Sequence, residues 1–292
     1  MRTTGIFTTQ YFRYNFNKIN KPMYLFPFGD IHAGSYMHDK QRWHRYLEWA
    51  KGKKDALFIG MGDYFDLGST SERRLLNSPD LHESTGSTLD DLYMDGVLRM
   101  TKELSFMRGR LIGLIEGNHY GVFTRTGITT TQKMCDILGC KYLGVASLIK
   151  LHIISTRNAN YSLDIFAHHG KGSGLLVGSG LNNVQKMADI AIADIYLMGD
   201  NHQKVLGYSD KLYLSRDSGH KVMRVKQKKQ LFARTGSFLK GYEDNKASYV
   251  TDKLLNPTNL GTIKIEITPK RVQVNENGKT YEENYLDLHA SL

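Results

Sequence analysis

Cysteine is scarce in this sequence, with Cys135 and Cys140 the only two among 292 residues. A zinc ribbon needs further cysteines at close spacing, and none accompanies this pair. We therefore expect two free or buried thiols in a reduced compartment.

Long hydrophobic runs are absent as well. No apolar run reaches the roughly eighteen residues that a membrane-spanning helix needs, and residues 1–9 lack the apolar core of a signal peptide. We therefore expect a cytoplasmic protein with no membrane association. Neither internal repeats nor a linker between domains can be found. The sequence thus predicts one domain over residues 1–292, with an N-terminal arm (1–20), a basic hairpin insertion (205–233) and a polar C-terminal tail (276–292).

Acidic residues are outnumbered, because 39 Lys and Arg against 29 Asp and Glu give a net charge of +10. A basic balance favours polyanionic partners such as nucleic acid or nucleotides, although a solvated basic surface gives the same count. The excess is uneven, since residues 220–229 contain five Lys and Arg and no acidic residue. Lys226, Lys228 and Lys229 are our candidate polyanion contacts, and Lys171, in a glycine- and serine-rich loop, is a candidate substrate contact.

The hydrophobic pattern alternates between strands and helices, which is typical of an α/β fold. Short apolar runs predict strands at 23–28, 56–61, 111–115, 148–154, 163–167 and 195–198. Helical spacing follows Asp39, which we expect to cap its helix, and Ser87, which with Asp90 forms a capping-box pattern. Residues 68–86 are expected to form a long loop, and residues 261–275 a final hairpin.

Polar side chains that could bind a metal follow five of these strands. Since open α/β sheets place ligands at the carboxyl ends of their strands, we expect these residues to converge. Mixed carboxylate, imidazole and amide ligands suit manganese, iron, zinc or nickel. Two such ions would clamp a phosphoryl group and lower the pKa of a bridging water. The residues in question are Asp30 and His32, Asp63 and Asp66, Asn118 and His119, His168 and His169, and Asp200 and His202.

This set of motifs resembles that of the calcineurin-like metallophosphoesterases, in particular the compact versions of bacteriophages and bacteria. The family pattern is Asp-x-His, Gly-Asp-x-x-Asp, Gly-Asn-His, a later His and Gly-His-x-His, and the resemblance covers residues 23–203. It implies a four-layer α-β-β-α fold, in which two mixed sheets pack face to face between flanking helices. It also implies a hydrolase that cleaves phosphoesters by in-line attack of a metal-bridging hydroxide.

The resemblance assigns a role to each residue by position. Asp30, His32, Asp63 and His202 would hold one metal ion, and Asp63 would bridge to a second ion held by Asn118, His168 and Asp200. His119 would protonate the leaving oxygen as general acid. His169 would contact the ligands without binding the metal or would simply be packed, and Asp66 would support the loops.

Two positions depart from the family pattern. Tyr120 stands where an acidic residue usually orients the catalytic histidine, so His119 needs another partner. Asp200 replaces a histidine, which adds negative charge and favours manganese over zinc.

Several substrates would fit the same metal ligands. We expect a phosphodiesterase or nuclease that acts on nucleic acid or a nucleotide. The alternatives are a phosphomonoesterase or protein phosphatase, and an inactive member of the fold that serves as a binding scaffold.

Overall fold

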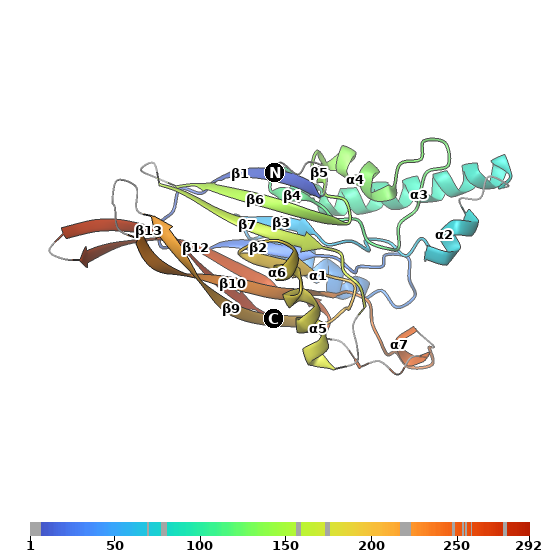
Figure 1. The fold of residues 1–292 in the computed structure, drawn as a ribbon. Coiled ribbons are helices and arrows are strands. Elements are labelled where there is room, and N and C mark those ends of the chain that lie inside the picture. Colours follow the sequence, from blue (N-terminus) through green and yellow to red (C-terminus); the bar gives the residue numbers. More distant parts are fainter. Residues whose placement is uncertain are drawn as a thin grey trace.

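The computed structural model describes residues 7–68, 70–76, 81–155, 159–172, 176–216, 223–246, 249–252, 254, 256–257, 259–276 and 279–292. Their strands form two mixed sheets (Figure 1). The six-stranded sheet has the order β13 (Lys279–Ser291), β12 (Lys264–Glu276), β2 (Met23–Phe28), β3 (Ala56–Gly60), β4 (Leu111–Leu114) and β5 (Lys141–Tyr142). The seven-stranded sheet has the order β1 (Thr8–Asn15), β6 (Ala146–Ile154), β7 (Asn160–His168), β8 (Ile195–Met198), β10 (Met223–Ser237) and β11 (Gly261–Thr262), with β9 (Lys204–Arg216) paired to β10.

Parallel pairing brings the functional strands into line. In the six-stranded sheet β2, β3 and β4 run parallel, and in the other sheet β7, β8 and β10 do. The strands β9 and β12 join these groups by antiparallel pairing. Within each sheet the carboxyl ends of the parallel strands therefore meet at one edge.

The largest buried apolar cluster contains side chains of both sheets, such as Leu57 of β3 and Ile165 of β7, so the sheets share one core. The helices pack on the other face of each sheet. A second cluster joins the six-stranded sheet to α1 (Lys40–Lys51), α3 (Glu83–Leu104) and α4 (Thr130–Leu138). A third joins the seven-stranded sheet to α5 (Val177–Gln185) and α6 (Met187–Ile190). The expectation of an α/β fold with two mixed sheets and helices is confirmed.

Local sequence explains where the helices begin and end. Asp39 caps α1, because its side chain accepts a hydrogen bond from the Arg42 N–H at 3.0 Å, as expected. Thr129 and Gln132 form a capping box at the start of α4, which ends at Gly139 with a left-handed φ of 69°. The helix α1 is held to α3 by Trp43, whose indole N–H donates to Glu103 at 2.7 Å.

Residues 68–86 were wrongly expected to be a loop. They include α2 (Thr70–Leu76), and α3 begins at Glu83 with His82 as its N-cap. The prediction that this helix starts at Ser87 was wrong, because Asp90 does not form the expected capping box with Ser87. Its carboxylate accepts from the Thr124 N–H at 2.7 Å and so ties the 122–127 segment to α3.

Two other expectations change at the ends of the chain. Residues 279–291 are not a polar tail but β13, which pairs along its length with β12. The sequence hid this strand because, among its described side chains, only Leu288 and Ala290 are buried hydrophobic residues. Within the expected arm, β1 pairs parallel with β6 at the edge of its sheet.

The remaining described elements are a short 3-10 helix (Ser105–Met107) and α7 (Tyr249–Asp252). Among the described residues, no helix has both the length and the apolar character needed to cross a membrane. Cys135 is buried, Cys140 is partly exposed, and both are free thiols.

Candidate metal centre

The five predicted strand ends converge at one edge, and backbone hydrogen bonds join them. The Ile31 N–H donates to the Asp63 carbonyl at 2.8 Å, which links the segment after β2 to that after β3. The Asp200 N–H donates to the Asp30 carboxylate at 3.1 Å, which links the two sheets. From β10, the Ser237 hydroxyl donates to the Asp30 carbonyl at 2.9 Å.

Left-handed backbone is concentrated at this edge. Eight described residues other than glycine have a positive φ, and five of them are Asp30, His32, Asp63, Asp200 and His202. Each such residue costs on the order of 1–3 kcal/mol and persists only where the surroundings hold it. The fold therefore bears a backbone cost at the residues whose side chains face the centre.

One group of side chains comes from both sheets. The ligand atoms of Asp30, His32 and His202 all lie within 4.8 Å of one another. The two Nε2 atoms of the histidines are 3.3 Å apart, and that of His202 is 3.8 Å from Asp30 Oδ1. Burial, followed by the influence of His32, lowers the pKa of His202. The His202 imidazole can therefore present a lone pair to a cation.

Asp63 lies between this group and a second one. Its Oδ1 accepts from the Asn118 and His119 N–H groups at 2.7 and 2.9 Å, which fixes the carboxylate. Its Oδ2 is 3.7 Å from His32 Nε2 and 3.3 Å from His169 Nε2. Gly117 permits this approach, because a Cβ there would lie 2.0 Å from Asp63 Oδ1.

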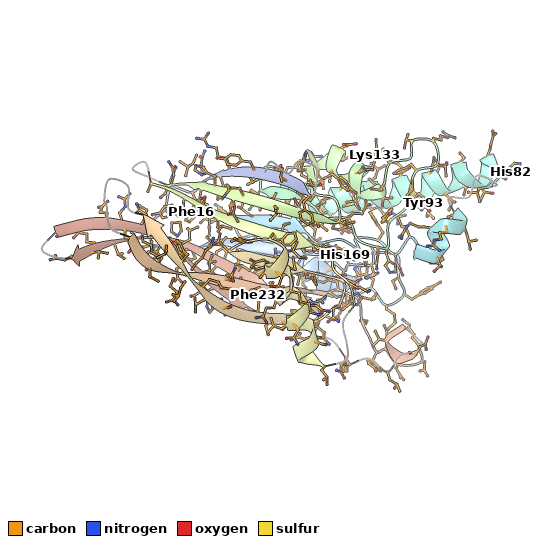
Figure 2. All side chains as sticks on the ribbon, in the orientation of Figure 1. Phe16, His82, Tyr93, Lys133, His169 and Phe232 are labelled. Atoms are coloured by element: carbon orange, nitrogen blue, oxygen red, sulfur yellow. The ribbon has the colours of Figure 1, made fainter. Side chains whose placement is uncertain are left out.

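The second group contains His169 and not His168. The ligand atoms of Asp30, Asp63 and His169 lie within 4.8 Å of one another, and His169 Nε2 is 3.6 Å from Asp200 Oδ1. His169 lies just beyond the end of β7, at the centre of Figure 2. Its Nδ1 is 2.8 Å from the Met61 carbonyl, which directs Nε2 towards the carboxylates. His168 is still in β7 and belongs to no such group among the described residues, so choosing it as the ligand was a misplacement by one residue.

Asn118 and Asp200 complete this side of the centre. The Asn118 side-chain amide nitrogen is 3.2 Å from Asp200 Oδ1, so the two predicted ligands are neighbours. Asn118 is exposed, whereas Asp30 and Asp63 are buried. The centre thus opens to solvent on the Asn118 side.

His119 has the partner that Tyr120 could not supply. Its Nδ1 is 2.9 Å from Asp66 Oδ1, and the same oxygen is 3.8 Å from His32 Nδ1. Although burial opposes it, the hydrogen bond with Asp66 raises the pKa of His119, and the same bond lowers the pKa of Asp66. Tyr120 instead packs under the guanidinium of Arg73 at 4.1 Å.

The buried groups influence one another strongly. Burial raises the pKa of Asp30 well above its usual range, and the charges of Asp63 and Asp200 add to this. Burial also opposes the charged forms of Asp63 and His169, but their pairing outweighs it. The pairing of the two side chains lowers the pKa of Asp63 and raises the pKa of His169 to about 10.

Arg234 is a buried cation behind the ligands, and the sequence analysis missed it. Its side chain is 0% exposed, and its guanidinium donates to the carbonyls of Gly199 at 2.6 Å and Gly180 at 3.2 Å. The charges of Asp200 and Asp30 act on it, while burial lowers its pKa. An arginine directly after the apolar run 231–233 was the available signal, because arginine is rarely buried unless it is paired. Arg73, which donates to the Asn118 carbonyl, gave no comparable signal.

The basic residues of β10 lie away from the centre. β8 runs parallel to β10, with Leu231 opposite Ile195 and Arg234 opposite Met198, so residues before 231 lie beyond the amino end of β8. At about 3.4 Å per residue, Lys226 is roughly 27 Å along the strand from Arg234. Lys226, Lys228 and Lys229 pair with Glu283, Asp194 and Asp287 at 3.1, 2.8 and 3.9 Å. These candidate polyanion contacts therefore do not lie beside the centre. Lys221 lies outside the described residues, and Lys171 is exposed.

The donor set suits a divalent metal. Among the described residues, His169 Nε2 is buried without a hydrogen-bond partner, and it faces two carboxylate oxygens. Buried Asp and His side chains are thus positioned to hold a metal ion. Comparison with protein-family models and with curated proteins finds no match for this chain.

Proposed function

We propose that this protein is a metal-dependent phosphoester hydrolase of the calcineurin-like type that acts on phosphodiesters. The observation that carries the proposal is the place of Asp63, whose Oδ2 faces His32 of one ligand group and His169 of the other. A carboxylate in that place suits a pair of neighbouring divalent ions. The order of layers, with two sheets that share a core and helices on their outer faces, supports the same family.

Asp30, His32 and His202 would hold the first ion, and His169, Asp200 and Asn118 the second, with Asp63 shared. Divalent ions bound there would supply Lewis acidity to a phosphoryl group and lower the pKa of a coordinated water. Asp200 brings a carboxylate to the second site, and we therefore favour manganese, a harder ion than zinc.

The residues of the chain supply proton transfer and orientation. His119 Nδ1 is engaged by Asp66, so Nε2 is the nitrogen that can carry a proton to a leaving oxygen. Asp66 orients the ring and favours its protonated form. Because this partner is present, the Tyr120 departure does not deprive His119 of a role as acid, which favours an enzyme over a binding scaffold.

The test combines metal analysis with hydrolysis of bis-p-nitrophenyl phosphate. We expect manganese to support hydrolysis and chelation to abolish it. Asp63→Ala should lose both ions by elemental analysis, because Asp63 is the ligand that we assign to both of them. His168→Ala is the matched control, and it should keep both ions. A wild-type protein that binds manganese without hydrolysing the diester would refute the proposed activity, and an Asp63→Ala variant with two ions would refute the bridging role.

A further inference from the structure

Arg73 of α2 contacts the segment that carries Asn118 and His119. Its guanidinium donates a hydrogen bond to the Asn118 carbonyl and lies 4.1 Å from the centre of the Tyr120 ring, within the roughly 6 Å of a cation–π contact. Asn118 is a proposed metal ligand, and His119 is the proposed general acid. One side chain therefore touches the residues on both sides of the acid.

The peptide that joins Asn118 to His119 is held on both of its sides. A trans peptide such as this one directs its carbonyl and its N–H in opposite directions. The His119 N–H donates to Asp63 Oδ1 at 2.9 Å, and the Asn118 carbonyl accepts from Arg73. Rotation of this peptide plane would move both side chains together, and the two hydrogen bonds oppose that rotation.

Arg73 also holds the backbone next to Asp66. Its Nη1 donates to the Gly68 carbonyl at 2.8 Å, two residues after the carboxylate that contacts His119. A guanidinium is planar and has five N–H donors, so it can lie on a ring and donate from its edge at the same time, whereas a lysine ammonium cannot. One guanidinium thus joins the two segments that carry the His119–Asp66 pair.

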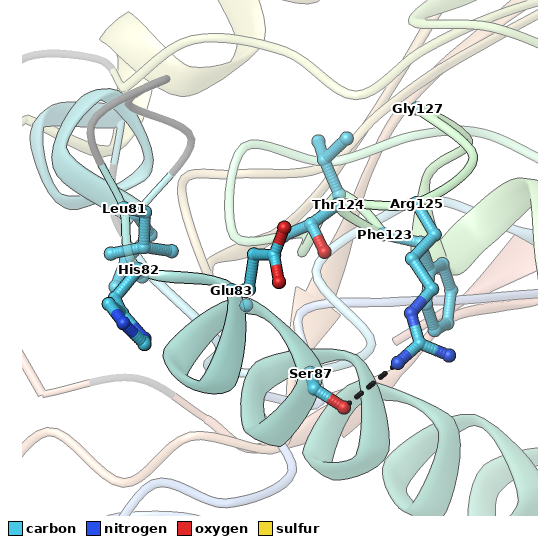
Figure 3. A pocket seen from close by; sticks show the side chains of 11 residues that line it. Leu81, His82, Glu83, Ser87, Phe123, Thr124, Arg125 and Gly127 are labelled. Carbon is cyan, nitrogen blue, oxygen red and sulfur yellow. Dashed lines mark hydrogen bonds between the residues drawn. The ribbon is translucent and has the colours of Figure 1, made fainter.

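The next arginine along this segment has a different partner. The Arg125 guanidinium donates to Ser87 Oγ at 3.0 Å, and Figure 3 shows it directed towards α3. The Thr124 hydroxyl donates to Asp90 of the same helix at 3.0 Å. The 122–127 segment is therefore anchored to α3, whereas the peptide before His119 is held by Asp63 and Arg73.

We propose that Arg73 is a positioning residue, which orients Asn118 towards the second ion and His119 towards the leaving oxygen by holding the peptide that joins them. The inference rests on the proposed function, and it adds a residue that acts without touching the substrate. It also gives Tyr120 a role, because the ring that replaces the usual acidic residue is the surface on which the guanidinium lies.

The kinetic test compares Arg73→Met with Arg74→Met, a matched change at the exposed neighbour on the same helix. The substrates are thymidylyl-thymidine, whose leaving oxygen needs a proton, and bis-p-nitrophenyl phosphate, whose p-nitrophenolate needs little. With saturating manganese, Arg73→Met should lower kcat for the first by about tenfold or more and for the second by less, with KM within about twofold for both. Arg74→Met should behave like the wild type. An unchanged kcat, or a KM that rises on both substrates as for a residue that binds them, would overturn the proposal.

Two further variants separate positioning from charge. Arg73→Lys keeps the charge but cannot keep both carbonyl bonds and the ring contact, so we expect it to lose part of kcat for thymidylyl-thymidine. Wild-type kcat in Arg73→Lys would show that charge alone suffices, which contradicts the proposal. Tyr120→Leu removes the ring and leaves the bonds, and it should cause a smaller loss in the same direction. If Arg73→Met does not fold, these two variants decide.

A manganese titration tests the role of Asn118. Among the proposed ligands, Asn118 is the one whose backbone Arg73 bonds. In Arg73→Met the affinity for one ion should therefore fall by about tenfold, the usual effect of changing a residue that supports a ligand, while the affinity for the other stays the same. Unchanged affinities for both ions would contradict the role of Arg73 in orienting Asn118.

Hydrogen exchange in the metal-free protein separates this inference from the proposed function. The His119 amide should exchange about tenfold faster in Arg73→Met than in the wild type, because one of the two bonds that hold its peptide is lost. The Ile31 amide, which donates to the Asp63 carbonyl, should exchange at the same rate in both. Equal rates at His119 would overturn the positioning role. If wild-type protein with manganese hydrolyses neither substrate, the proposed function fails, and the exchange rates alone then decide whether Arg73 holds the peptide.

Discussion

Strand β10 carries basic residues at both ends, and the two ends behave differently. At its carboxyl end Arg234 is fully buried, and all of its described hydrogen bonds are donated to carbonyl groups. The negative charges of Asp200 and Asp30 stabilise its charged form. At its amino end Lys226, Lys228 and Lys229 are partly exposed and paired with carboxylates of the same chain. The density of basic residues in the sequence indicated the lysines as functional cations, whereas burial in the structure indicates Arg234. Position in the sheet, and not the number of charges, decides which cations lie near the candidate metal centre.

The largest effect is expected at His119, the proposed general acid. His119→Ala should slow hydrolysis of thymidylyl-thymidine by roughly 10² to 10⁴-fold, the usual contribution of general acid catalysis. With bis-p-nitrophenyl phosphate the loss should be smaller, because p-nitrophenolate needs little protonation. Elemental analysis should find the metal content of the wild type. Equal losses on both substrates would contradict the role of His119 as acid.

Arg234 should matter next. Arg234→Met leaves the carbonyls of Gly199 and Gly180 without their donor and removes the cation on which Asp200 and Asp30 act. An unsatisfied buried polar group typically costs about 1–3 kcal/mol of the free energy of unfolding. We expect the cost, measured by urea unfolding of the metal-free protein, to be smaller in an Asp200→Asn background. Equal costs in the two backgrounds would mean that Arg234 acts only through its hydrogen bonds to carbonyl groups. Lys226→Met is the matched control, with an expected cost of about 0–1 kcal/mol.

The sequence predicted the centre better than its surroundings, for a physical reason. Strand ends and metal-capable side chains are local features, so five separate segments could be assigned before any contact was known. The choice between His168 and His169 depended on the exact residue at which β7 ends, which pairing with β6 and β8 determines. The partnership of Asp66 with His119 joins residues 53 positions apart, and no local pattern records it. The same holds for β13, which forms a strand because it pairs with β12, although its composition is polar.

The pH profile provides a subtler contrast within the centre. Asp66 raises the pKa of His119, so the protonated acid persists to higher pH, and activity should fall as pH rises through that pKa. Asp66→Asn removes this influence and should move the basic limb of the kcat/KM profile to lower pH. The matched control is Asp164→Asn, a change at a surface carboxylate paired with Lys150. A basic limb that stays in place in Asp66→Asn would show that another group sets it.

The smallest effect should come from the lysines of β10. Replacing Lys226, Lys228 and Lys229 with Gln should leave thymidylyl-thymidine hydrolysis unchanged, because these residues lie at the far end of the strand. Oligonucleotide affinity and its salt dependence should also change little, since each lysine already faces a carboxylate. If the salt dependence of the variant corresponded to up to about three fewer phosphate contacts than that of the wild type, the hairpin would again be a candidate polyanion site.

The hydrogen bond from Ser237 to the Asp30 carbonyl has a consequence for synthesis of the chain. It joins residues 207 positions apart, and β10 also supplies Arg234. Contacts of such separation form late and slowly, because a long loop must close first. A ribosome that has completed β8 and the His202 turn has made every proposed ligand, yet the strand that supports them is still missing. Metal loading during translation should therefore wait for the last fifth of the chain.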